Sequence, residues 1–260
     1  MRYREHAPPP ALAPFVACVW EVVSSGEAHR VLPDGAMDVL FAVGEARARV
    51  IGPMTRAIVT GEGAPSCVVG VRFRPGAGVE VLGLAARELR DESAEVADVW
   101  GAEGRSLDAR LAEAKSAHDA MVALEAELTA RVARARAPDP RVARAVALLH
   151  ANGGELPIPA VAASVGIGER QLTRLFDERV GYGPKVFARV ARLQRATAAI
   201  ARGSIASWAR LAVSCGYADQ AHLVREFRAL TGVTPRLYAS ARAVSEIDNP
   251  AHGPLASLDA

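Results

Sequence analysis

The sequence contains few cysteines and no long hydrophobic run. Its three cysteines, Cys18, Cys67 and Cys215, are odd in number and far apart, so they lack the spacing of a zinc site or a disulfide framework. We expect them to be buried free thiols. No window approaches the roughly 20 apolar residues of a membrane span, and the first residues lack the apolar segment of a signal peptide. The sequence therefore predicts a cytoplasmic protein without membrane contact.

Enzyme motifs are absent as well. There is no Gly-rich phosphate loop, nucleophile elbow or His-Glu-x-x-His motif, so nothing in the sequence proposes a reaction. His29 and Asp34 could serve as metal ligands, but no His-x-His pair accompanies them. We therefore predict no enzyme, no cofactor and no metal.

The length of 260 residues favours two domains, and 50% hydrophobic with 23% charged residues is typical of folded proteins. Charge is divided unevenly. Residues 1–138 carry 16 Arg and Lys against 19 Asp and Glu, a net charge of −3, whereas residues 139–243 carry 15 against 7, a net charge of +8. A basic C-terminal part beside a mildly acidic N-terminal part indicates that one domain meets a polyanion.

Short apolar, β-branched runs separated by Gly and Pro turns occupy the N-terminal part. The runs cover residues 15–23, 36–43, 49–51 and 67–73. Such runs predict a small barrel or sandwich, cupin-like in outline.

After Pro75-Gly76 the spacing becomes helical and predicts an antiparallel pair of helices. Their apolar stripes are Leu107, Leu111 and Ala114, then Met121, Leu124, Leu128 and Val132. The sheet or a second subunit could cover these stripes. We expect a mixture, with part of one stripe pairing across the two-fold axis of a homodimer.

Two prolines at 138 and 140 interrupt the helical pattern where the charge balance changes sign. We therefore expect three parts in an α+β protein. Residues 1–136 form a β-rich domain with a helical hairpin, residues 139–243 an all-α domain, and residues 244–260 a flexible tail.

The all-α domain contains an internal repeat. Four positions recur after fifty residues, since Val161, Ala162, Ser164 and Gly166 correspond to Leu211, Ala212, Ser214 and Gly216. Five more recur after fifty-one residues, since Leu172, Arg174, Phe176, Gly181 and Pro184 correspond to Leu223, Arg225, Phe227, Gly232 and Pro235. A one-residue insertion in the turn accounts for the changed offset. Each copy predicts a helix, a turn at Gly166 or Gly216, and a second helix.

In the second helix of the first copy, Leu172, Leu175 and Phe176 have the spacing of a core face. The solvent face is then Arg170, Gln171, Thr173 and Arg174. Arg can pair bidentately with guanine and Gln with adenine, so this face suits base edges. A single such helix is more often just a solvated surface, but two copies in a basic domain favour DNA binding.

A helix predicted between Pro184 and Gly203 joins the two copies. About 18 residues at 1.5 Å each give a length of about 27 Å. That length can hold two recognition helices near one DNA turn apart, about 34 Å, so one chain could contact two successive major-groove segments.

Residues 216–227 (GYADQAHLVREF), followed by 230–235 (LTGVTP), resemble the C-terminal motif of the AraC/XylS family of transcription regulators. The resemblance covers residues 140–242 and implies a helical DNA-binding domain with two helix-turn-helix units. Carried over by position, it implies base-facing residues at Arg170, Gln171, Thr173, Arg174, Gln220, Ala221, His222 and Arg225. The sequence departs from the family at Gly168, where Ser often caps the helix, and Ala221 is too short to bond a base.

Residues 31–41 and 70–76 resemble an N-terminal domain found on many uncharacterised regulators, which specifies no ligand. Strand alternation places Arg72 and Arg74 on one face. They could bind an anionic effector, or pair with Asp34 and Asp38 in an internal salt-bridge set, which is the more common arrangement.

We expect duplex promoter DNA as the partner, with a small-molecule effector and RNA polymerase as further candidates. Two alternatives stay open. A ligand-binding module without DNA would leave the repeat unexplained, and an Ada-like sensor would require clustered cysteines that the sequence lacks.

Overall fold

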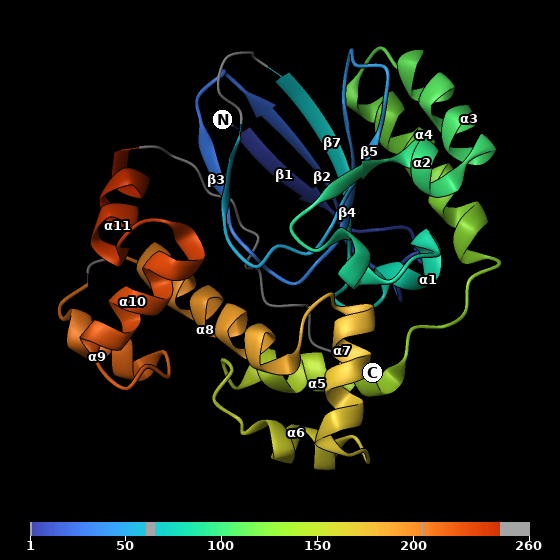
Figure 1. Cartoon of the computed structure of the whole chain (residues 1–260). Helices are drawn as coiled ribbons and strands as arrows, with labels where there is room; N and C mark the ends of the chain where they lie inside the picture. Colours follow the sequence, from blue (N-terminus) through green and yellow to red (C-terminus); the bar gives the residue numbers. More distant parts are fainter. Residues whose placement is uncertain (1, 61–65, 204, 245–260) are drawn as a thin grey trace.

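The computed structural model describes residues 2–60, 66–203 and 205–244 (Figure 1). Eight strands lie in its N-terminal part: β1 (Arg2–His6), β2 (Val16–Ser24), β3 (His29–Val31), β4 (Asp38–Ala42), β5 (Arg49–Ile51), β6 (Ile58–Thr60), β7 (Ser66–Phe73) and β8 (Ser93–Glu95). Six form an antiparallel sheet in the order β1-β2-β7-β4-β5-β8, while β3 and β6 pair separately. The α+β class with an N-terminal sheet is confirmed.

One face of the large sheet packs against helices. These are α1 (Gly78–Leu82), the 3-10 helix η1 (Ala86–Leu89), α2 (Val96–Trp100), α3 (Ala102–Ala112) and α4 (Ala117–Val132). Alternate residues of β7, namely Val69, Val71 and Phe73, are fully buried on this face, as strand periodicity requires. Figure 1 shows α2, α3 and α4 together on this side of the sheet.

The apolar stripes of α3 and α4 lie inside this same core, so the expectation that part of a stripe pairs with a second subunit is wrong. Leu107, Leu111 and Leu124 have no exposed surface, and Leu128 is 1% exposed. Met121 and Val132 also pack against the sheet core. The sheet and the hairpin bury both stripes, because α4 lies directly on β7. These stripes therefore offer no apolar surface to a partner subunit. The homodimer itself stays a prediction.

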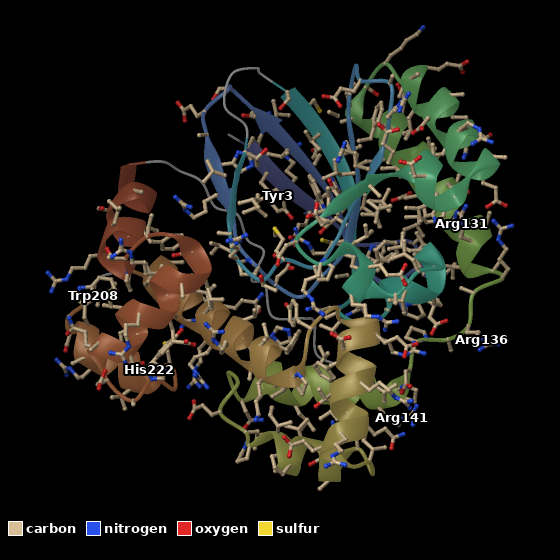
Figure 2. The ribbon with its side chains drawn as sticks, viewed as in Figure 1. Tyr3, Arg131, Arg136, Arg141, Trp208 and His222 are labelled. Atoms are coloured by element: carbon tan, nitrogen blue, oxygen red, sulfur yellow. The ribbon has the colours of Figure 1, made fainter. Side chains whose placement is uncertain are left out.

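The opposite face of the sheet has a small cluster of its own. Trp20 lies across Gly70, where a Cβ atom would stand 2.4 Å from the indole ring, so only glycine fits this position. The indole nitrogen donates to Asp38 at 2.8 Å, and Tyr3 stacks on the indole. Figure 2 shows Tyr3 in this sheet.

Seven helices follow in the part of the chain described up to residue 244: α5 (Pro140–Ala151), α6 (Ile158–Ser164), α7 (Glu169–Arg179), α8 (Pro184–Ala201), α9 (Trp208–Ser214), α10 (Gln220–Thr231) and α11 (Pro235–Val244). The predicted linking helix is α8, and it contributes to two cores. Phe187 and Val190 belong to the core around α5, α6 and α7, whereas Leu193 and Ile200 belong to the core around α9, α10 and α11. The predicted tail from residue 245 onward lies outside the described residues.

The repeat forms two helix-turn-helix units, as predicted: α6 with α7 and α9 with α10. Gly166 and Gly216 both adopt a positive φ, +70° and +80°, in the turn of each unit. The inserted residue lengthens the second turn, so α10 starts one residue later relative to α9 than α7 does relative to α6.

Candidate nucleic-acid interface

The first recognition helix, α7, exposes every residue that was predicted to face bases. Arg170, Gln171, Thr173 and Arg174 are exposed, whereas Leu172, Leu175 and Phe176 are buried. Gly168 stands at the N-cap in an extended conformation and gives no side-chain hydrogen bond to the helix. An open hollow of about 730 Å³ lies at this end, lined by Gly168, Glu169, Arg170 and Thr173. The free amide groups of the first turn therefore lie at an accessible surface.

The second recognition helix, α10, has a different N-terminal end. Gln220, Ala221 and Arg225 are exposed, but His222 is half-buried. The Asp219 side chain accepts a hydrogen bond from the His222 backbone at 2.6 Å. His222 Nδ1 accepts from the Ala218 backbone at 3.2 Å, which leaves Nε2 to carry the ring proton as a donor.

Ion pairing separates the arginines of the helical domain into two groups. Several are held by carboxylates, such as Arg189 by Glu226 at 2.9 Å. Arg170, Arg174 and Arg225 form no ion pair among the described residues. Their guanidinium groups are therefore free to meet phosphates or base edges.

Two ion pairs and one hydrogen bond join the linking helix α8 to the two units. Arg189 of α8 binds Glu226 of α10, and Arg195 of α8 binds Glu155 in the loop before α6 at 2.5 Å. The Cβ of a residue at 216 would lie 2.7 Å from the Glu155 side chain, so this loop also contacts the second turn. Arg192 adds a bond to the Gly154 carbonyl at 3.1 Å. The two units are thus held in one arrangement.

Three of the four candidate effector residues lie close together, and the fourth, Arg74, lies apart. Asp34 and Asp38 each lie 3.4 Å from Arg72 Nε, and all three side chains are 12–14% exposed. Burial raises the pKa of the Asp38 carboxyl, and the Arg72 guanidinium opposes that rise. Arg74 does not join them, because its Nε donates to the Ala13 carbonyl at 2.9 Å. The arrangement is that of an internal ion-pair set, with Arg74 used to hold the chain before β2.

The cysteines do not form a reactive group. Cys18 and Cys215 are buried and Cys67 is half-buried, all as free thiols. Burial raises the pKa of Cys18 to about 12 and raises the pKa of Cys67 and Cys215 as well, which disfavours the thiolate that an alkyl acceptor needs. Within residues 2–60, 66–203 and 205–244 there is no group of three or more potential metal-binding side chains. No helix in this part of the chain is long and apolar enough to cross a membrane.

The N-terminal part contacts the C-terminal ends of both recognition helices. Arg90, which follows η1, donates to the Gly181 carbonyl and to Asp177, and Arg179 pairs with Glu80 of α1. Arg30 of β3 donates to the Thr231 carbonyl at 2.9 Å. Sequence reasoning missed these contacts, because an arginine in a strand or turn carries no local mark of a distant partner.

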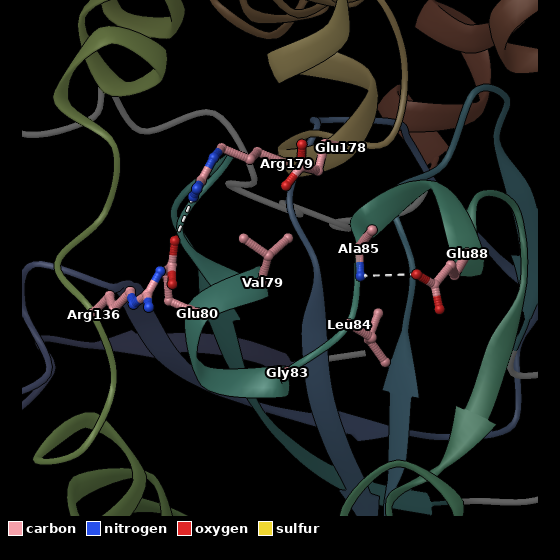
Figure 3. Close-up of a pocket in the computed structure, with 9 residues that line it drawn as sticks. All are labelled: Val79, Glu80, Gly83, Leu84, Ala85, Glu88, Arg136, Glu178 and Arg179. Carbon is pink, nitrogen blue, oxygen red and sulfur yellow. Dashed lines mark hydrogen bonds and ion pairs between the residues drawn. The ribbon is translucent and has the colours of Figure 1, made fainter.

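A pocket of about 350 Å³ lies at the boundary between the two parts (Figure 3). It is bounded by α1, by Arg136 of the connecting segment and by Glu178 and Arg179 of α7. The Glu80–Arg179 ion pair forms one side, and Leu84 projects toward the opposite side. Five of the nine residues that line this pocket are charged, so the pocket itself is mainly polar.

Comparison with known proteins gives matches in both parts of the chain. Residues 4–95 match a domain of unknown function, DUF6597, and residues 141–241 match a helix-turn-helix domain. No curated protein matches the chain significantly.

Several solved structures are similar. A transcriptional regulator with an AraC-type DNA-binding domain from Chromobacterium violaceum is 31% identical, with 40% of this chain and 93% of that chain covered and a TM-score of 0.38. The DNA-binding domain of AdpA in complex with a target DNA is 25% identical, covering 41% and 97%, with a TM-score of 0.38. ToxT from Vibrio cholerae covers 92% and 97% at 8% identity, with a TM-score of 0.45.

The sequence identity to the Chromobacterium violaceum regulator extends over nearly all of that protein, and the helix-turn-helix match covers both units of the repeat. Together with the two exposed recognition helices, these matches establish that the chain belongs to the AraC-type family of DNA-binding transcription regulators.

Proposed function

We propose that this regulator contacts two successive major-groove segments of one operator, one with α7 and one with α10. The observation that carries this proposal is the pair of equivalent helices, each with an unpaired arginine at the same position, Arg174 and Arg225. Arg170, Gln171 and Thr173 act with the first arginine, and Gln220, Ala221 and His222 act with the second. Arg and Gln supply bidentate hydrogen bonds to guanine and adenine, and Ala221 offers a methyl group for thymine.

The linking helix supports the proposed spacing. The 18 residues of α8 span about 27 Å at 1.5 Å per residue, which is compatible with recognition helices near one DNA turn apart, about 34 Å. His222 contributes through Nε2, since Nδ1 is already engaged with Ala218.

We propose that residues 1–136 form a regulatory domain and residues 139–243 the DNA-binding domain. The two family matches, 4–95 and 141–241, fall within these limits. Because Arg72 is already neutralised by Asp34 and Asp38, an effector at that site would have to displace an existing ion pair. Dimerisation and contact with RNA polymerase are further proposals that go with the family, and no catalytic residue is assigned.

Selection of bound fragments from genomic DNA by the full-length protein tests the proposal. We expect enrichment of a site with two half-sites about one helical turn apart. The logarithm of the binding constant should fall linearly with the logarithm of the salt concentration, with a slope of about −0.9 for each phosphate that the protein neutralises. The double variant Arg174→Ala/Arg225→Ala should lose the enrichment. A matched control is Arg47→Ala/Arg110→Ala, which removes two charges far from the helices in sequence. Failure to enrich any sequence would favour a ligand-binding module or a sensor without an operator.

A further inference from the structure

Two arginines of the N-terminal domain bind main-chain carbonyls at the ends of the two recognition helices. Arg30 Nη1 donates to the Thr231 carbonyl at 2.9 Å. Arg90 Nε donates to the Gly181 carbonyl, and its Nη2 bonds Asp177 in the last turns of α7. Thr231 is the last residue of α10, and Gly181 follows α7 by two residues. The C-terminal end of a helix carries partial negative charge and carbonyls without intrahelical donors, so a guanidinium is a favourable partner there.

The two bound ends are equivalent in the repeat. Gly181 and Gly232 are separated by the fifty-one-residue offset, and both have a positive φ, +91° and +78°, just after their helices. Arg30 and Arg90 come from β3 and from the turn after η1, so they lie sixty residues apart in the sequence. The two bound carbonyls, those of Gly181 and Thr231, are fifty residues apart and so differ by one position in the repeat. A single domain thus binds the C-terminal end of the second helix in both units.

Other contacts at each end add to this attachment. The Ala57 amide, beside β6, donates to the Leu230 carbonyl at 2.7 Å, while Arg179 pairs with Glu80. A Cβ atom at Gly181 would lie 2.3 Å from Pro53, which shows how closely the N-terminal domain approaches α7. Figure 1 shows the upper end of α7 beside α1, and α10 and α11 on the side of β3.

The attachment leaves the proposed DNA-contacting faces open. Arg170, Arg174, Gln220 and Arg225 are all exposed in the full chain. The N-terminal domain therefore holds the helices by their ends and does not cover their DNA-contacting side chains. Its effect on DNA binding should act through the relative placement of α7 and α10.

We propose that Arg30 and Arg90 are positioning residues that set the distance and angle between the two recognition helices, and so determine the half-site spacing that the chain accepts. This inference rests on the proposed function. Without these two bonds, the placement depends on α8 with its ion pairs and on the remaining contacts of Ala57 and Glu80 with the helix ends. The selectivity for spacing should then weaken.

The test uses the full-length protein and the operator selected above, with one or two base pairs inserted between the half-sites. Two base pairs turn the second half-site by about 70°, so the wild type should lose at least about ten-fold in affinity. For Arg30→Ala/Arg90→Ala we expect a loss of less than about three-fold between the same two DNAs. Arg30→Lys/Arg90→Lys should recover part of the selectivity, because an ammonium group can still donate to a carbonyl.

The control is Arg47→Ala/Arg110→Ala, which removes the same charge from residues that pair within the N-terminal domain, with Glu95 and Glu127. It should keep the wild-type dependence on spacing. If the Arg30/Arg90 variant loses the same factor as the wild type on insertion, the positioning role is overturned while the proposed function stands. If the wild type itself selects no DNA, the proposed function fails instead.

A measurement without DNA tests the inference independently. Ala163→Cys and Val213→Cys place spin labels at equivalent exposed positions of α6 and α9, and a Cys67→Ser background removes the half-buried native thiol. The distance distribution between the labels should be narrow in the parent and clearly broader after Arg30→Ala/Arg90→Ala. An unchanged width would overturn the proposal. The single variants serve if the double variant does not fold, since each releases one helix end.

Discussion

In the first helix-turn-helix unit, α7 has Gly168 as an N-cap without a side-chain hydrogen bond. The helix exposes four polar residues to solvent and ends in close contact with the N-terminal domain. In the second unit, the N-cap Asp219 of α10 accepts a side-chain hydrogen bond at 2.6 Å. This helix exposes the short Ala221 and ends in looser contact with the N-terminal domain. The repeat therefore conserves the core positions but not the means of holding each helix. The first unit depends more on its neighbouring domain, and the second more on its own turn.

The largest effect is expected from the equivalent core residues Phe176 and Phe227, which have no exposed surface. Replacing either by Ala should lower the free energy of unfolding by about 3–5 kcal/mol through lost burial and a cavity. Phe176 contacts Phe187 and Phe227 contacts Tyr238, so each change should disturb its own unit first. Urea unfolding, followed by circular dichroism, measures the free energy of unfolding of each variant. Val213→Ala, at a 64% exposed site, is the control. A loss below about 1 kcal/mol for either Phe variant would contradict the close packing of that ring in its core.

The next effect distinguishes the two helix ends. Gly181→Ala and Gly232→Ala both place a Cβ at positive φ, which costs about 1–2 kcal/mol. At Gly181 the Cβ also meets Pro53 at 2.3 Å and the Ala86 carbonyl at 3.2 Å, whereas at Gly232 the nearest atom is Arg30 Nη1 at 3.6 Å. We therefore expect Gly181→Ala to lose about 1–3 kcal/mol more in stability than its counterpart. Equal losses of stability for the two variants in thermal or urea unfolding would show that the N-terminal domain does not pack closely against the end of α7.

Arg174→Ala and Arg225→Ala should each weaken operator binding by about 1–3 kcal/mol and relax the preference at one base pair, in different half-sites. Arg170 and Gln171 remain beside Arg174, while Ala221 offers no hydrogen bond beside Arg225. The second half-site should therefore become the less specific of the two. Affinities for a panel of single-base operator variants measure this. Wild-type binding of both operator and random DNA by both variants would show that these helices do not contact bases.

The smallest effects concern the N-caps. Asp219→Ala removes the bond to the His222 amide and should cost about 0.5–2 kcal/mol of stability. Gly168→Ser supplies a hydroxyl where α7 has none and should gain a few tenths of a kcal/mol. In thermal unfolding, the midpoint temperature should therefore fall for Asp219→Ala and rise for Gly168→Ser. Shifts of the same sign would mean that the caps do not distinguish the units.

Strands with an apolar pattern were predictable and strands without one were not. The runs that predicted β2, β4, β5 and β7 lie close to their observed limits. The charged edge strand β1 and three of the four three-residue strands, β3, β6 and β8, were missed, because strands so short or so polar show no period of two. The equally short β5 was predicted from its β-branched residues. Pairing with a neighbour, not local sequence, makes them strands.

By itself the sequence determined the repeat, its two buried faces and the exposed residues of α7 and α10, because helical periodicity fixes which side chains share a face. Only the tertiary structure decided that the apolar stripes of α3 and α4 pack against the sheet. It also decided that Arg72, and not Arg74, pairs with Asp34 and Asp38. The bonds of Arg30 and Arg90 to the ends of the recognition helices likewise depend on the packed fold. Those contacts join surfaces separated by long stretches of chain. Their partners are main-chain carbonyls or single carboxylates, which every sequence offers in many places, so only the packed fold selects among them.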